Sequence, residues 1–291
     1  MEPHSVDLVI TGATKDIGGF EVRRLLPVAK RRAVGPFVFL DHMGPAVLAA
    51  GKGLDVRPHP HIGLATVTYL YDGSILHRDS VGSVQEISPG DVNWMTAGRG
   101  IVHSERSGEA ARAVDQRVHG LQMWVALPLQ QQETDPVFAH TPKSELPEIS
   151  GPGWKGRLIA GSLFGKTSPV TTLNPLFFAD IRLDAGADLD LAAGYDEAAL
   201  YVVEGEIQID GKPIEEGNLA VLRNYATPTI TAVKSSVLAI FGGDTLPEPR
   251  FMYWNFVSTS RERIDRAKQD WQHGVFDPVP GETEFTPLPE G

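Results

Sequence analysis

The most informative part of this sequence is Arg57-Pro-His59-Pro-His61-Ile-Gly63, together with Gly100-Ile-Val-His103-Ser-Glu105 further along. Each stretch places two potential metal-binding side chains at positions i and i+2. Because alternate residues of a β-strand point to the same face, each pair can aim both side chains into one barrel interior. Three imidazoles and one carboxylate suit Fe(II), Mn(II), Ni(II), Cu(II) or Zn(II), and contain too much nitrogen for Mg²⁺ or Ca²⁺.

Most of the remaining sequence has the pattern of an all-β protein. The 291 residues include 30 glycines and 22 prolines, spread throughout the chain. They separate short runs rich in Val, Ile, Leu, Thr and Tyr, which is typical of a β-sandwich or barrel. These runs occupy residues 37–40, 65–71, 84–87, 121–127, 199–203, 206–209, 219–222 and 237–241.

One helical pattern stands out near the C-terminus. Thr259-Ser-Arg-Glu262 has the spacing of a capping box. Ile264, Ala267 and Trp271 then form an apolar stripe, and Gly274 provides a stop signal. The sequence therefore predicts one short helix near residues 260–273.

The composition between the two halves of the chain predicts a linker at residues 131–153. This region begins with glutamines and is then punctuated by prolines, with few apolar runs. We expect an N-terminal metal-binding domain at 1–130 and a C-terminal domain at 154–291, which ends in the helix.

The two halves also resemble each other weakly. Tyr69-Leu-Tyr-Asp-Gly73 in the first half matches Tyr201-Val-Val-Glu-Gly205 in the second half, and this match favours a duplication. The offsets of His59 and His61 from Gly73, applied to Gly205, lead to Leu191 and Ala193. The second copy is therefore expected to lack metal ligands.

The charge and composition of the chain limit the classes of function that it can have. The net charge is −11 and the pI is about 5.3, so we expect no direct nucleic-acid binding. The chain has no cysteine, which excludes disulfides and thiolate chemistry and fits a reducing compartment. It shows no signal peptide and no apolar stretch of about eighteen residues. A soluble, cytoplasmic protein without a membrane span is expected.

A nicotinamide cofactor is not expected, although Ile10-Thr-Gly-Ala-Thr-Lys-Asp-Ile-Gly-Gly19 resembles a dinucleotide-binding turn. Asp16 stands where that turn needs a glycine for close approach to the pyrophosphate. No Tyr-x-x-x-Lys pair and no alternation of strands with helices follow it.

The first half follows the cupin pattern and, more narrowly, resembles the pirin family. The resemblance lies in His59-Pro-His61, in Thr66-Val-Thr-Tyr-Leu70, and in Pro89-Gly-Asp-Val-Asn-Trp-Met-Thr-Ala-Gly-Arg-Gly-Ile-Val-His-Ser-Glu105. Segments 18–24, 35–42 and 259–271 are also pirin-like, so the resemblance covers nearly the whole chain.

This resemblance implies an all-β bicupin, in which two jelly-roll β-barrels, each a double-stranded β-helix, lie face to face. It also implies one divalent metal, usually iron, in the N-terminal barrel. The family's ligands correspond to His59, His61, His103 and Glu105. One departure is Ala65, where many pirins keep a glutamate.

The activity that the resemblance implies is that of a quercetin 2,3-dioxygenase, which cleaves a flavonol with O₂. Fe(II) is the first choice of metal, with Ni, Cu, Mn and Zn as alternatives, and Glu105 is the candidate general base. An alternative is a non-enzymatic regulator that senses redox or metal state and binds a protein partner. A third is a cupin that only binds a sugar or another metabolite.

Several other residues keep more than one interpretation. His77 suits a strand-pairing or exposed position as well as a place in the pocket, and His42 suits a turn or core edge better than the surroundings of the metal. Arg99 suits an anionic substrate or a salt bridge, whereas Trp94 suits the core better than a platform for the substrate. The remaining histidines belong to no motif and are expected on the surface: His4, His119, His140 and His273.

Overall fold

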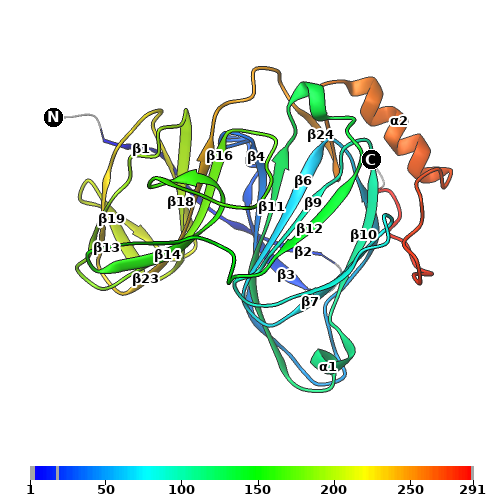
Figure 1. Cartoon of the computed structure of the whole chain (residues 1–291), viewed down its shortest axis with the longest axis horizontal. Coiled ribbons are helices and arrows are strands. Elements are labelled where there is room, and N and C mark those ends of the chain that lie inside the picture. Colours follow the sequence, from blue (N-terminus) through cyan, green and yellow to red (C-terminus); the bar gives the residue numbers. More distant parts are fainter. Residues whose placement is uncertain (1–3, 18–19, 290–291) are drawn as a thin grey trace. The chain divides into compact units, whose positions relative to one another are not determined.

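The computed structural model describes residues 4–17 and 20–289, so Gly18 and Gly19 of the pirin-like segment 18–24 lie outside it. The described part is built almost entirely from β-strands and contains two α-helices, α1 (Glu109–Arg112) and α2 (Arg261–Gln272), with one 3-10 turn, η1 (Leu129–Gln131) (Figure 1). The all-β fold class and the short C-terminal helix are therefore confirmed.

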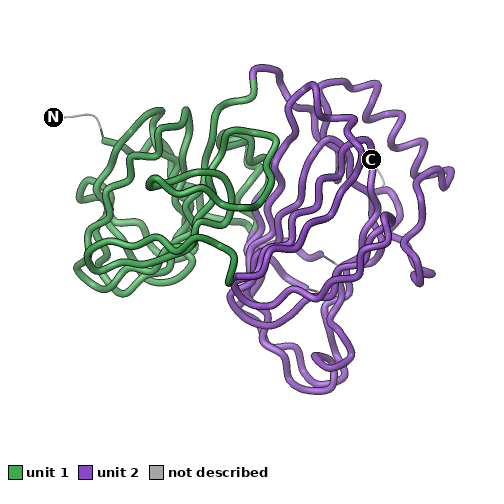
Figure 2. Tube along the Cα trace, viewed as in Figure 1, with its two compact units in different colours: residues 1–13, 24–39, 144–246 green, residues 14–23, 40–143, 247–291 purple. Residues whose placement is uncertain are grey.

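Contacts divide the chain into two compact units (Figure 2). Unit 1 contains residues 1–13, 24–39 and 144–246, and unit 2 contains residues 14–23, 40–143 and 247–291. Helix α2 thus belongs to the unit that holds most of the first half of the chain. The predicted domains, 1–130 and 154–291, are continuous segments of the chain, whereas the two units are defined by contacts and each contains several segments. The predicted boundaries therefore stay a prediction.

Unit 2 is built on two sheets that share an interior. One has the strand order β12-β9-β6-β11-β4-β3-β2, and the other has the order β5-β10-β7-β8. A small two-stranded sheet, β24-β25, adjoins α2. The bounds of these strands are β2 (Ala13–Asp16), β3 (Glu21–Leu26), β4 (Phe37–Leu48), β5 (Asp55–His61), β6 (Leu64–Asp72), β7 (Ile75–Asp79), β8 (Val84–Ile87), β9 (Val92–Thr96), β10 (Ile101–Arg106), β11 (Gln116–Ala126), β12 (Val137–Thr141), β24 (Phe251–Tyr253) and β25 (Phe256–Ser258).

Unit 1 repeats the plan of a large and a small sheet around an apolar core. The large sheet has the order β1-β21-β18-β23-β16-β14-β13, with β15 paired to β14, and the small sheet has the order β17-β22-β19-β20. Its core includes Leu200, Ile207 and Ile240, all fully buried. The bounds of these strands are β1 (Val6–Thr11), β13 (Glu148–Gly151), β14 (Trp154–Leu163), β15 (Lys166–Thr167), β16 (Leu176–Leu183), β17 (Asp188–Asp190), β18 (Glu197–Glu204), β19 (Glu206–Ile209), β20 (Lys212–Glu215), β21 (Asn218–Leu222), β22 (Thr229–Ala232) and β23 (Ser236–Gly243).

The region predicted as a linker, 131–153, contains two strands. β12 pairs with β9 at one end of its sheet, and β13 pairs with β14 at the end of another. Pro136 and Pro142 flank β12, and Pro147 directly precedes β13. Edge strands tolerate nearby prolines because one of their sides forms no ladder hydrogen bonds. Two short edge strands therefore have a proline-rich composition that resembles a linker.

The weak internal repeat agrees with the strand order. Gly73 follows β6 and precedes β7, and Gly205 follows β18 and precedes β19. Both glycines have positive φ, 84° and 93° respectively, a conformation that L side chains rarely adopt. The two matched sequence stretches thus end in the same kind of turn.

Helix α2 begins one residue later than the sequence predicts. Its N-cap is Ser260, whose Oγ accepts the backbone N–H of Arg263 at 3.1 Å. Thr259 is engaged elsewhere, because its backbone N–H donates to Gln132 Oε1 at 3.1 Å. The stripe packs as expected, with Ile264 and Ala267 buried against Phe256.

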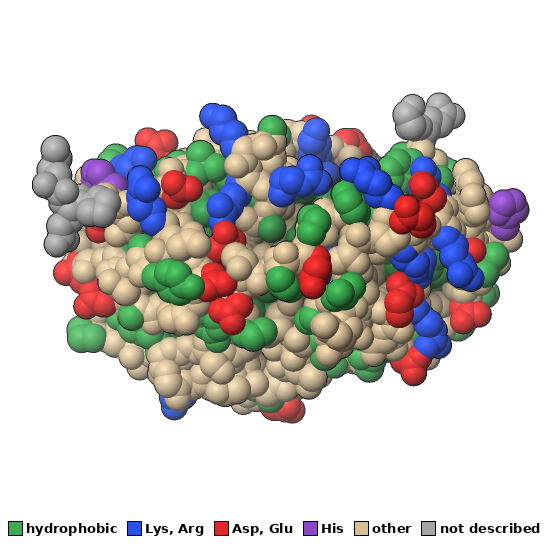
Figure 3. Space-filling model, turned by 90° about the horizontal axis from the view of Figure 1, so that it is seen from above, with side chains coloured by type: hydrophobic (Ala, Val, Ile, Leu, Met, Phe, Trp, Pro, Cys, Tyr) green, Lys and Arg blue, Asp and Glu red, His purple; other side chains and the backbone are tan. Residues whose placement is uncertain are grey.

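None of the described helices is long and apolar enough to cross a membrane. On the molecular face drawn in Figure 3, Lys and Arg side chains lie among Asp and Glu side chains.

Candidate metal centre

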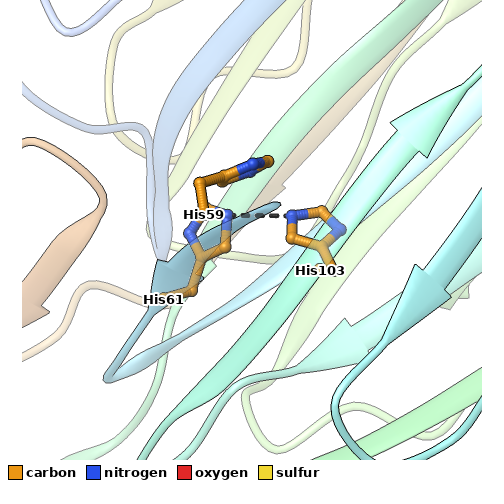
Figure 4. A group of neighbouring side chains, drawn as sticks. All are labelled: His59, His61 and His103. Atoms are coloured by element: carbon orange, nitrogen blue, oxygen red, sulfur yellow. Dashed lines mark hydrogen bonds between the residues drawn. The ribbon is translucent and has the colours of Figure 1, made fainter. Parts of the chain in front are cut away.

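The three histidines come together because β5 and β10 are antiparallel neighbours in the small sheet of unit 2. His103 lies directly opposite His59, and Ile101 lies opposite His61. Directly opposed residues and alternate residues share a face, so all three rings enter the barrel interior. Figure 4 shows His59 and His61 on one strand and His103 on the next, with their rings gathered together.

The cluster has the size of a metal site. One ring nitrogen from each of the three histidines lies within 4.8 Å of the other two. Nε2 of His61 and Nε2 of His103 are 3.0 Å apart. Two nitrogens bound at right angles to a metal, with bonds of about 2.1 Å, would be separated by about the same distance. Within residues 4–17 and 20–289 this is the one such group of three or more His, Cys, Asp or Glu side chains.

Burial keeps the three imidazoles neutral. The side chains of His59, His61 and His103 are 8%, 1% and 1% exposed. Burial lowers the pKa of His59 to about 4 and lowers the pKa of His61 and His103 well below the usual 6.5. His59 Nδ1 donates to the carbonyl of Arg57 at 2.9 Å, which leaves its Nε2 as a free lone pair. Neutral, buried imidazoles suit a divalent transition metal.

Glu105, the fourth predicted ligand, is buried but does not belong to this cluster. The register of β10 against β5 shifts by one residue between His103 and Glu105, so Glu105 pairs with Val56. Thr68 Oγ1 donates to Glu105 Oε1 at 3.1 Å. Burial raises the pKa of Glu105, while His77 and the Thr68 hydroxyl oppose that shift. Its role as a metal ligand stays a prediction.

Thr68 also links Glu105 to the large sheet. Its Oγ1 also lies 2.9 Å from Oε1 of Gln122. A hydroxyl has one proton to give, so Thr68 donates it either to Glu105 or to the Gln122 oxygen, and an exchange of the Gln122 amide oxygen and nitrogen would let Thr68 serve both partners. The carboxylate is thus held by a short network that spans the barrel interior.

His77 is the residue whose place near the site the sequence did not decide. It is buried on β7, opposite Glu105, and its Nδ1 lies 3.4 Å from Nδ1 of His103. Its Nε2 lies 2.9 Å from Asp79 Oδ2. The signal for it was present, because His77-Arg-Asp79 repeats the i, i+2 spacing of the ligand pairs.

The other candidates lie away from the cluster. The prediction that His119 is a surface residue is wrong: it is buried, and its Nε2 lies 2.8 Å from His42 Nε2. His119 lies on β11 and His42 on the neighbouring strand β4, so His119 is buried by the pairing of two strands that are far apart in the sequence. The sequence alone does not reveal that pairing. Arg99 forms a salt bridge with Asp135 at the surface. Trp94 is in the core, as predicted.

Two β-barrel units, one of which encloses three histidines on paired strands, define this chain as a bicupin with a buried site suited to a divalent metal. The pirin family profile matches residues 19–125. The profile of the pirin C-terminal cupin domain matches residues 178–277. The chain belongs to the pirin family.

Its relatives include proteins named for quercetin oxidation. A pirin-like protein of Caulobacter vibrioides is 48% identical and covers 98% of this chain and 100% of its own. A Pseudomonas aeruginosa protein named as a candidate quercetin 2,3-dioxygenase is 38% identical over 93% of this chain and 85% of its own. The crystal structure of a quercetin 2,3-dioxygenase from Acinetobacter baumannii matches with a TM-score of 0.91 at 31% identity, covering 97% and 95% of the two chains.

Proposed function

We propose that this protein is an iron-dependent dioxygenase that cleaves a flavonol such as quercetin. The observation that carries the proposal is the buried cluster of His59, His61 and His103. The likeness to a quercetin 2,3-dioxygenase structure supports the substrate class. In this reaction both atoms of O₂ enter the ring-opened product, and one carbon of the heterocycle leaves as carbon monoxide.

Each residue of the site has a defined task in this proposal. His59, His61 and His103 would hold the metal, and Glu105 would complete the ligand set. A divalent metal held there would supply Lewis-acid and redox chemistry for the reaction of the flavonol with O₂. Glu105 accepts the proton of the flavonol 3-hydroxyl, and the Thr68 hydroxyl holds its other oxygen in place.

One aromatic side chain lies against the cluster. Trp124 on β11 is edge-on to His61, with ring centroids 5.3 Å apart and an interplanar angle of 78°. Edge-to-face contacts of this kind are favourable for aromatic groups.

We place the protein in the cytoplasm, because a chain without cysteine fits a reducing compartment.

The test is oxygen-dependent consumption of quercetin after anaerobic reconstitution with Fe(II). Loss of the flavonol absorbance with release of carbon monoxide is expected for the wild type. His103→Ala should lose tight metal binding and turnover together. His140→Ala is the matched control, because His140 lies on β12, bonds to Asn93 and belongs to no cluster.

Two outcomes would overturn the proposal. One is full activity of His103→Ala. The other is stoichiometric metal binding with no turnover in the presence of iron, nickel, copper or manganese. The second result would favour the alternative of a regulator that senses metal or redox state and binds a protein partner.

A further inference from the structure

A second pair of interior side chains stands directly behind one metal ligand. β7 pairs with β10 so that Asp79 lies opposite His103 and His77 lies opposite Glu105. Asp79 and His77 are 0% and 3% exposed. Since directly opposed residues share a face, both side chains point into the same interior as the ligands.

The three groups form a chain of contacts that ends at a fixed carboxylate. His103 Nδ1 lies 3.4 Å from His77 Nδ1, and His77 Nε2 lies 2.9 Å from Asp79 Oδ2. Asp79 Oδ1 accepts two backbone N–H groups, those of Val81 at 3.1 Å and Ser83 at 2.9 Å. The turn after β7 therefore holds Asp79 still.

The plane of the His77 ring is fixed as well. The ring stacks on Phe138, with centroids 4.3 Å apart and an interplanar angle of 15°. Phe138 comes from β12, on the large sheet of the same unit. His77 is thus held at its edge by Asp79 and on its face by Phe138.

This arrangement determines which nitrogen of each ring carries a proton. An ionised carboxylate can only accept, so His77 must donate to Asp79 from Nε2. A His77 whose single ring proton lies on Nε2 presents a lone pair at Nδ1, which faces Nδ1 of His103. His103 therefore carries its proton on Nδ1 and keeps a lone pair on Nε2, the nitrogen 3.0 Å from His61 Nε2.

We propose that His77 and Asp79 are positioning residues that set the tautomer and ring orientation of the metal ligand His103. The proposal depends on metal binding by the three histidines and not on the dioxygenase reaction. Partners of this kind behind a metal ligand typically contribute 10- to 100-fold to metal affinity.

The first test is the affinity for Zn(II), measured by competition with a chelator, for the wild type and Asp79→Asn. The asparagine can keep the two backbone hydrogen bonds through its oxygen, and its amide nitrogen then faces His77 Nε2. That donor forces the His77 proton onto Nδ1, against the Nδ1–H of His103. We expect Zn(II) affinity to fall by about 10- to 100-fold.

The matched control is Asp180→Asn, because Asp180 is also a buried aspartate, 6% exposed, on β16 of unit 1. Its Zn(II) affinity should equal that of the wild type. His77→Phe serves as a second variant, since it preserves the stacking on Phe138 and the turn that Asp79 anchors. It should weaken Zn(II) binding to a similar extent, and it decides the matter if Asp79→Asn does not fold.

The protonation of individual ring nitrogens is a second measurement, and a simple loss of stability would not change it. In ¹⁵N-histidine NMR spectra of the Zn(II)-bound wild type, protons are expected on His103 Nδ1 and His77 Nε2. Asp79→Asn should lose the His77 Nε2 proton, while the His59 Nδ1 proton, donated to Arg57, stays as an internal reference. A wild-type His77 protonated on Nδ1, or a folded variant of either kind that binds Zn(II) within twofold of the wild type, would overturn the proposal.

Discussion

Glu105 has two predicted roles, as fourth metal ligand and as general base, and its surroundings bear on both. It lies two residues beyond His103 on the same strand, and β10 is in regular register with β7, so Glu105 points to the same side of the strand as His103. The irregular register against β5 comes from one extra residue in β5, between Val56 and His59, and it leaves the alternation along β10 intact. The carboxylate is thus inside the barrel, buried and anchored by Thr68.

Glu105→Gln should lower quercetin turnover by at least about 100-fold if Glu105 takes a proton in the reaction, since general bases typically contribute 10²- to 10⁴-fold. Glutamine keeps an oxygen for the Thr68 hydrogen bond but cannot accept the proton. Turnover of the Fe(II)-loaded protein is the measurement, with bound iron quantified in parallel. Thr68→Val is the control and should cost only a few-fold. An unchanged turnover number in Glu105→Gln would remove the general base from the mechanism.

The strands that carry the ligands are braced on their outer side by the segment that follows α2. Thr286 donates its backbone N–H to the carbonyl of Pro58 at 2.8 Å, on β5. Ser104 and Arg106 of β10 both bind Glu282: the Ser104 hydroxyl donates at 2.8 Å, and Arg106 forms two hydrogen bonds of 2.8 Å. Because strand residues alternate, Ser104 and Arg106 face away from the interior that His103 and Glu105 line. The C-terminal segment therefore holds β5 and β10 in their pairing.

Glu282→Ala should destabilise the protein by about 1–3 kcal/mol at pH 7, the usual contribution of hydrogen bonds to charged groups. Arg106, the main cause, lowers the pKa of Glu282 below its usual 4.5. The stabilisation is therefore complete above pH 4.5 and is lost as the pH falls through the lowered pKa. Urea unfolding at pH 7 and at pH 3 would measure this difference.

Glu284→Ala is the matched control for that prediction. Glu284 also contacts Arg106 at 2.8 Å, but its side chain is 56% exposed, compared with 10% for Glu282. Exposed ion pairs contribute little, so this variant should lie within about 0.5 kcal/mol of the wild type. An equal loss of stability in Glu282→Ala and Glu284→Ala would show that the segment after α2 does not act through the buried Glu282 carboxylate.

Buried neutral histidines should make the folded state sensitive to acid. Burial is the main reason that the pKa of His42 is lowered to about 3, and His119 and Arg23 add to the effect. In the unfolded chain His42 regains its usual pKa of 6.5 and binds a proton at a higher pH than in the folded protein. The free energy of unfolding is therefore unaffected by His42 above pH 6.5 and falls as the pH drops from there toward 3.

Between pH 7 and pH 5, His42 alone should reduce the free energy of unfolding by about 2 kcal/mol, because each unit below 6.5 costs about 1.4 kcal/mol. His42→Gln should show a correspondingly weaker dependence on pH in this range. Urea unfolding of both proteins in the presence of a metal chelator is the measurement. His273→Gln, at an exposed histidine, is the control. Parallel pH profiles for His42→Gln and the wild type would contradict this account.

Several features of the fold could be predicted because they depend on neighbours in sequence. The short apolar runs at 65–71 and 219–222, separated by glycines and prolines, predicted strands, which the structure has as β6 and β21. The apolar stripe of Ile264 and Ala267 predicted helix α2, and only its N-cap differed by one residue. The strands β12 and β13 were missed because a proline-rich edge strand has the composition of a loop.

The sequence by itself determined which side chains share a strand face: His59 with His61, His103 with Glu105, and His77 with Asp79. That follows from the alternation of residues along an extended chain and needs no tertiary contact. Only the tertiary structure decided which of these pairs meet, because meeting depends on strand pairing. The pairing of β10 with β5 gathered three imidazoles, and the meeting of the small sheet with the large one brought Glu105 within hydrogen-bond distance of Thr68. The pairing of β10 with β7 placed His77 and Asp79 behind His103, since register between distant strands is a property of the folded barrel and not of either strand alone.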